Sequence, residues 1–127
     1  MTEIKNLAET TRQQLKLKYD SDSVKYLEGF IERTKVNMDK DNWNGLITSC
    51  GAFLGECVIR NFGGEWKKDY NGTVCVKFDK NNMAYPFAKT EKQFENGLGD
   101  SIHSFYSAIP TVFGIEKKSK KKKWWKF

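Results

Sequence analysis

The sequence WNGLITSCGAFLGECVIRNF, residues 43 to 62, is followed directly by Gly63 and Gly64. Its apolar side chains recur at helical spacing along one broad arc, wider than a helix lying in solvent needs. The members of this arc are Trp43, Leu46, Ile47, Cys50, Phe53, Leu54, Cys57 and Val58. The pattern predicts a central core helix, ended by the two glycines in a left-handed C-cap.

Gly51 and Gly55 lie four residues apart beside this arc. A glycine inside a helix costs about 1 kcal/mol relative to alanine, so something must compensate for both. We expect another backbone to pack closely against this face. Glu56 and Arg60 have the i,i+4 spacing of an ion pair on the polar side of the same helix.

Two helices are expected before the central one. Residues 2 to 18 are rich in good helix formers but carry a weak apolar stripe. A second helix ends near Lys35. Its N-cap candidates are Asp20, Ser21, Asp22 and Ser23.

After Gly64 the apolar period changes from 3.6 to 2, which is typical of strands. A first strand begins at Trp66, a second covers residues 74 to 79, and a third covers residues 83 to 87. Pro86 removes a backbone donor, so the third strand lies at a sheet edge or ends there. We expect a three-stranded antiparallel meander.

Two short helices complete the chain. Thr90 and Gln93 have capping-box spacing and open the first of them. Asp100 or Ser101 caps the second, which Pro110 is expected to end. The order of elements predicts an α+β domain: N-terminal helices with a central buried helix, a three-stranded meander, and C-terminal helices on one sheet face.

The positive charge is concentrated at the end of the chain. The net charge is +6, but seven lysines and no acid lie in residues 117 to 127, so residues 1 to 116 carry 15 basic and 16 acidic residues. We expect a nearly neutral domain over residues 1 to 116 and a flexible Lys/Trp-rich tail over residues 117 to 127.

The composition of this tail suits an anionic partner. Lysines attract phosphates, and tryptophans suit a membrane interface or base stacking. The tail is therefore expected to contact an anionic membrane surface or a nucleic acid, the alternative being a purely solubilising end. The residues assigned to this contact are Lys120, Lys121, Lys122, Lys123, Trp124, Trp125 and Lys126.

The chain shows no secretory signal, and no apolar stretch approaches the roughly 20 residues that cross a bilayer. We expect a cytoplasmic protein, peripheral to the inner membrane face if its tail binds lipid, with reduced cysteines. Cys50 and Cys57 are expected in the core, and Cys75 is expected to be more accessible.

Four residues are candidate binding residues: Glu56, Arg60, Trp66 and Tyr85. Glu56 could line a cleft where helix meets sheet, and the alternative is a solvated ion pair with Arg60. Trp66 and Tyr85 could form an aromatic pocket with Phe87, although aromatic residues in strands more often belong to the core.

His103 is the single histidine and could act as a general base or a metal ligand. No motif supplies the partners that either role needs, so a structural or surface role is favoured. No catalytic residue, metal site or cofactor is predicted.

The segments GAFLGE (51 to 56), NFGGEW (61 to 66), YPF (85 to 87) and QFENG (93 to 97) resemble a small bacterial family of unknown function. This resemblance spans residues 23 to 109 and implies a bacterial cytoplasmic origin, with no activity to transfer. Small immunity-type proteins of bacterial conflict systems are similar in size and in their glycine–tryptophan turns, which is an analogy and not a match.

Together these features favour a non-catalytic cytoplasmic module, of the immunity type in that analogy, that binds a protein partner. The rival hypothesis is a small enzyme that uses Glu56 with His103, or with another acid, in a cleft beside the meander. Glu56 and His103 at hydrogen-bond distance around a common pocket would favour the enzyme. No oligomeric state is predicted.

Overall fold

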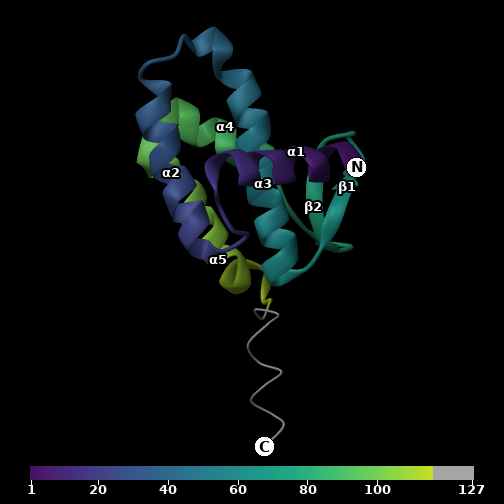
Figure 1. Ribbon diagram of the computed structural model, residues 1–127. Helices are drawn as coiled ribbons and strands as arrows, with labels where there is room; N and C mark the ends of the chain where they lie inside the picture. The colour runs from purple at the N-terminus through teal and green to yellow at the C-terminus, as the bar shows by residue number, and fades with distance from the viewer. Residues whose placement is uncertain (116–127) are drawn as a thin grey trace, which may run out of the picture.

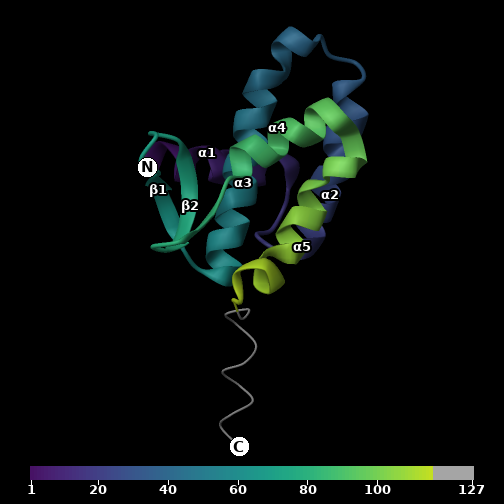
Figure 2. The same ribbon diagram turned by 180° about the vertical axis from the view of Figure 1, so that it is seen from behind.

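The computed structural model describes residues 1–115 and confirms the α+β class (Figures 1 and 2). The predicted tail lies outside the described residues. The α-helices are α1 (Thr2–Leu15), α2 (Ser21–Lys35), α3 (Trp43–Phe62), α4 (Pro86–Asn96) and α5 (Ile102–Phe113). The strands are β1 (Glu65–Lys68), β2 (Val74–Asp79) and β3 (Asn82–Ala84), and two short 3-10 helices are η1 (Lys40–Asn42) and η2 (Gly97–Asp100).

Helix α3 is the centre of the fold, as its apolar arc predicts. Every residue from Cys50 to Val58 is buried. Figure 1 shows α3 between the sheet on one side and α2 and α5 on the other, with α1 crossing it. None of the described helices is long and apolar enough to span a membrane.

The sheet is the predicted antiparallel meander, with strand order β1-β2-β3. Trp66 pairs with Val76, and Val76 pairs with Ala84, so one row of buried side chains crosses all three strands. The expected third strand is too long. It ends at Ala84, and Pro86 is the first residue of α4, where the missing N–H has no helical partner to lose.

The start of α4 therefore corrects the predicted capping box. Thr90 lies inside the helix, and its hydroxyl donates to the Pro86 carbonyl at 2.8 Å.

At the start of α2, Asp20 is the N-cap and accepts a hydrogen bond from the Ser23 amide at 2.8 Å. That helix ends at Lys35, as predicted.

Helix α5 begins as predicted and ends later than predicted. The Ser101 hydroxyl caps it by accepting hydrogen bonds from the next two free amides, those of His103 and Ser104. The helix runs through Pro110 and closes at Gly114, which has a φ of 64°. An internal proline costs about 3 kcal/mol. The packing of Phe113 against Phe78, with ring centroids 5.0 Å apart, offsets part of that cost.

Gly51 and Gly55, two of the three glycines of α3, leave room chiefly for aromatic rings. At Gly55 an added Cβ would collide with the indole of Trp66, so the expected neighbouring backbone is wrong there. At Gly51 the neighbours are the ring of Phe87 and its Cα, 3.1 Å from an added Cβ. Gly63 ends α3 at φ 98° and ψ −168°, a positive φ outside the left-handed helical region that we expected.

All three cysteines are free and buried. This confirms the prediction for Cys50 and Cys57, and the expected accessibility of Cys75 is wrong. Cys75 lies in the central strand, paired with Lys67 of β1, and is 0% exposed. Burial raises the pKa of the Cys50 thiol to about 12.

Candidate functional site

Three of the four candidate residues meet in one hydrogen-bonded group, in which Glu56 and Trp66 are buried and Arg60 is exposed. Glu56 is only 3% exposed. One of its carboxylate oxygens accepts a 2.8 Å hydrogen bond from the Trp66 indole N–H, and the other accepts from Arg60 Nε at 3.3 Å. The ion pair expected on the polar side of α3 therefore exists, but its carboxylate is inside the protein. Both carboxylate oxygens already hold a donor.

This group continues into a chain of contacts that reaches α1. The Arg60 guanidinium lies 3.9 Å above the centre of the Tyr19 ring. The Tyr19 hydroxyl donates to Glu9 at 2.9 Å, and Arg12 donates to the same carboxylate at 2.6 and 2.9 Å. The hydrogen bonds from Arg12 and then Tyr19 lower the pKa of Glu9 to about 2. These contacts tie β1, α3 and the segment between α1 and α2 together.

Tyr85, the fourth candidate, lies apart from this group. Its hydroxyl donates to Asp69 at 2.9 Å. Phe87, its expected aromatic neighbour, packs instead against Trp66, with ring centroids 5.5 Å apart. The structure therefore places Trp66 and Phe87 in one cluster and directs Tyr85 toward a different surface.

His103 does not join Glu56. Its Nε2 lies 3.1 Å from the Ser21 hydroxyl oxygen, at the start of α2. The arrangement that would favour the enzyme hypothesis, Glu56 and His103 in hydrogen-bond contact around a pocket, is therefore not found among the described residues.

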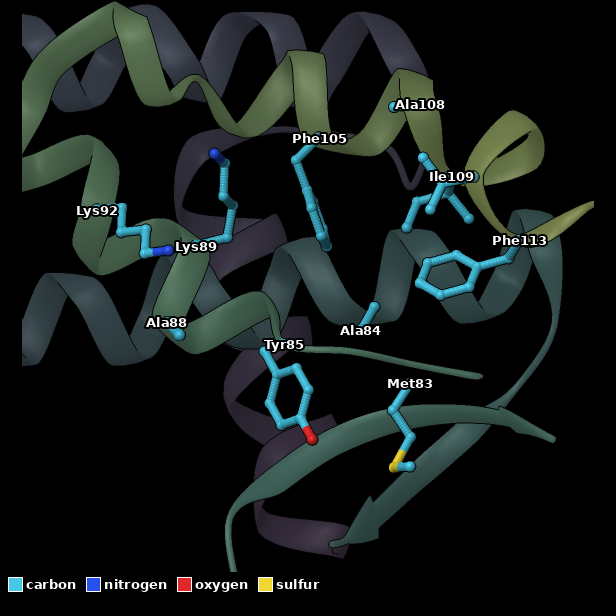
Figure 3. A pocket seen from close by; sticks show the side chains of 11 residues that line it. Met83, Ala84, Tyr85, Ala88, Lys89, Lys92, Phe105, Ala108, Ile109 and Phe113 are labelled. Atoms are coloured by element: carbon cyan, nitrogen blue, oxygen red, sulfur yellow. The ribbon is translucent and has the colours of Figure 1, made fainter. Parts of the chain in front are cut away.

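A hollow of about 280 Å³ lies between β3, α4 and α5, and we call it the α5 groove (Figure 3). Its strand side is formed by Met83, Ala84 and Tyr85, and its α4 side by Ala88, Lys89 and Lys92. Its α5 side consists of Phe105, Ala108, Ile109, Val112 and Phe113. Apart from Tyr85 and the two lysines, every residue that lines it is apolar.

Helix α5 has a second apolar stripe along this groove. The five residues that α5 contributes recur at i, i+3, i+4, i+7 and i+8, which is the spacing of one helix face. The first stripe, which includes Ile102 and Tyr106, is buried in the core. On the second stripe Val112 is 68% exposed and Ala108 is also exposed. Ile109, in the middle of this stripe, is only 2% exposed, so the part open to solvent is Ala108 and Val112, one turn apart.

One end of the α5 groove is cationic. Figure 3 shows Lys89 and Lys92 at the end opposite Phe113. Lys89 forms an ion pair with Asp100, with Nζ and Oδ1 3.1 Å apart. Lys92 is exposed and forms no ion pair within residues 1–115. The groove is thus apolar along most of α5, and at one end it carries the Lys92 ammonium group, which has no carboxylate partner within residues 1–115.

A buried glutamine fixes the two helical walls relative to each other. Gln93 of α4 is fully buried, and its side-chain N–H donates to the Glu28 carbonyl of α2 at 3.0 Å. Its side-chain oxygen accepts from the Ile102 amide, at the start of α5, at 2.9 Å. Sequence reasoning assigned Gln93 to a helix cap. Its actual role is to hold α2, α4 and α5 together, so the groove is part of the folded framework.

Sequence reasoning also missed the groove itself. The spacing of Phe105, Ala108, Ile109, Val112 and Phe113 is visible in the sequence. The prediction that Pro110 ends the helix leaves Val112 and Phe113 outside it, so the second stripe is not predicted. A helix continued through Pro110 would have revealed the second stripe.

Comparison with known proteins provides no further assignment. No family model, no curated protein and no solved structure matches this chain.

Proposed function

We propose that this chain is a non-catalytic protein-binding module that receives its partner in the α5 groove. The observation that carries this proposal is the second apolar stripe of α5, where Ala108 and Val112 are exposed to solvent although the groove beside them is built on a buried framework. Contiguous exposed apolar surface on a soluble protein usually marks an interaction site.

The composition of the groove supports a protein partner. Phe105, Phe113 and Met83 provide large apolar contacts, and such side chains in a pocket often dominate the binding free energy. Complete burial of one Val or Phe side chain contributes about 1.5–3 kcal/mol. Ala88 and Ala108 are small, so a partner backbone can approach both walls closely.

The enzyme hypothesis has less support. Its acid, Glu56, is held by Trp66 and Arg60, and its proposed partner His103 contacts Ser21 instead. In the α5 groove the titratable side chains are Tyr85 and two lysines, and the Tyr85 hydroxyl is already donated to Asp69. The groove lining therefore offers no carboxylate or histidine to act with these groups as a general acid–base pair.

Two further parts of the proposal, the contact with an anionic partner and the cytoplasmic location, are supported by the charge distribution and by the state of the cysteines. Residues 117 to 127 would add a contact to an anionic membrane surface or a nucleic acid, since they hold seven lysines and no acid. A cytoplasmic location is supported by three cysteines that are all unpaired.

The proposal can be tested by site-specific crosslinking in the cells that make this protein. A photo-crosslinking residue is placed at Ala108, in the groove, or at Ser107, an exposed neighbour on the same helix that does not line the groove. We expect a discrete protein adduct from position 108 that position 107 does not form. The same adducts at both positions, or adducts at neither, would contradict the proposal.

A further inference from the structure

We infer that the segment bound in the α5 groove is an amphipathic α-helix of a protein partner with acidic residues at one end of its apolar face. This inference rests on the proposed function and adds the chemistry of the partner. It is drawn from the shape of the groove and from the position of its two lysines.

The groove has the shape of a helix-binding surface. From Phe105 to Phe113 the second stripe of α5 runs for about 12 Å, which is slightly more than two helical turns. Packed helices lie about 8–10 Å apart, depending on the side chains at the contact, and small residues such as Ala88 and Ala108 permit a close approach. A helix with apolar residues at i, i+3, i+4 and i+7 would bury this stripe.

An extended peptide fits this surface less well. Such a peptide would bind by adding a strand to the free edge of β3, where backbone hydrogen bonds supply the affinity. β3 has only three residues and spans about 10 Å, so it offers few of these bonds. The apolar surface, in contrast, extends along α5.

The charges of the groove select an acidic partner. Lys89 and Lys92 are three residues apart on α4. Asp100 forms its ion pair with Lys89 and accepts a hydrogen bond from Asn96, whereas Lys92 forms no ion pair within residues 1–115. A carboxylate from the partner would therefore meet Lys92 at the groove end opposite Phe113. Because this ammonium group is exposed, its pairing would contribute more to specificity than to affinity.

Two other occupants lack the required charge. A second copy of this chain that offered its own α5 would bring no carboxylate, because Ile102–Phe113 contains no Asp or Glu. Residues 117 to 127 of the same chain contain seven lysines and no acid, and would place like charges against Lys92. An acidic helix of another protein satisfies both the apolar and the charged parts of the groove.

The test uses three labelled helical peptides of roughly 18 residues, about 27 Å long. The first has four leucines on one face and glutamates at one end of that face. The second has lysines in place of the glutamates. The third keeps the glutamates and replaces the leucines with serines, so it reports binding to the lysine-rich end of the chain alone. Fluorescence anisotropy measures the affinity of each peptide for the full chain.

Four forms of the full chain are compared: wild type, Ala108→Glu, Lys92→Glu and Lys68→Glu. Lys68 is exposed on β1 and does not line the groove, so Lys68→Glu makes the same charge change elsewhere. We expect the first peptide to bind wild type at least about tenfold more tightly than the other two. Lys92→Glu should weaken the first peptide by about three- to tenfold and strengthen the second, whereas Lys68→Glu should change neither.

The outcomes separate this inference from the proposed function. If the first and second peptides bind equally, or the second binds more tightly, and Ala108→Glu weakens both, the groove is a binding site but the acidic partner is refuted. If no peptide responds to Ala108→Glu, the proposed function fails at this surface. If the first and third peptides bind equally, the contact is with the lysine-rich end and the inference is wrong.

Discussion

The indole N–H of Trp66 donates a 2.8 Å hydrogen bond to the carboxylate of Glu56, ten residues earlier in the chain. The same indole ring lies against Gly55, where any side chain would collide with it. One tryptophan of β1 is therefore held by two adjacent residues of α3, so the sheet is fixed on the central helix by a polar contact and by a steric one.

Loss of the indole donor should destabilise the fold strongly. Trp66→Phe leaves the buried Glu56 carboxylate with Arg60 as its only bonded donor, and we expect a loss of at least about 2 kcal/mol in the free energy of unfolding. Urea denaturation of Trp66→Phe, Glu56→Gln and the double variant isolates the interaction. We predict a coupling of about 1–3 kcal/mol, and additive effects would refute the polar contact as a source of stability.

Alanine substitutions at Gly55 and Gly45, two of the three glycines of α3, should give opposite results. Gly55→Ala places a methyl group into the Trp66 ring and should destabilise by about 1–3 kcal/mol. Gly45→Ala is the matched control, because nothing lies within 4 Å of an added Cβ there, and it should stabilise by up to about 1 kcal/mol. Thermal unfolding measures both changes. Equal effects at the two positions would contradict the close approach of Trp66.

The three thiols should be unreactive in the native protein. Burial raises the pKa of Cys50, Cys57 and Cys75, so little thiolate is present near neutral pH. A thiol-specific disulfide reagent should label none of them quickly in buffer and all three in denaturant. Rapid labelling of one native thiol would show that its residue is accessible.

Acid should remove the contribution of the Glu9 contacts. The pKa of this carboxyl is lowered from 4.5 to about 2, so its stabilisation is present above pH 4.5 and is lost as the pH falls toward 2. The difference in stability between wild type and Glu9→Gln should therefore be largest near neutral pH and shrink across that window. A difference that stays constant from pH 6 to pH 2 would contradict this assignment.

The sequence predicts α3 and the meander because the helical spacing of apolar residues in α3 and their alternation in the strands are both regular. The two prolines account for the main errors in the other elements. The sequence pattern predicts a strand end at Pro86 and a helix end at Pro110, but Pro86 occupies the first turn of α4 and Pro110 lies within α5. A proline at a first helical turn costs little, and the cost inside a helix can be offset by tertiary packing.

The candidate site was harder to predict than the fold. The spacing of Glu56 and Arg60 indicates an ion pair but not whether it is buried, because burial depends on where the hairpin places Trp66. Tyr85 was selected as a binding residue and lines the α5 groove, but the remainder of the groove depends on how α4 lies against α5. That geometry is set by Gln93, a long-range contact that no local pattern reveals.

Binding to anionic surfaces should belong to the end of the chain. Residues 1 to 116 are close to neutral, so deletion of residues 117 to 127 should abolish binding to vesicles that contain anionic lipid, or to single-stranded nucleic acid. Binding of the full chain should weaken steeply with salt. Retained binding after the deletion would place a basic site within residues 1 to 116.

The central claim is that the second apolar stripe of α5 is the binding surface. The most direct test is the affinity of the partner recovered through position 108 for wild type, Ala108→Glu and Ser107→Glu. Both substitutions add one carboxylate at an exposed position of the same helix, and only Ala108 lines the groove. We predict that Ala108→Glu weakens binding at least about tenfold, or 1.4 kcal/mol, while Ser107→Glu leaves it unchanged. Equal affinities for all three proteins would contradict the claim.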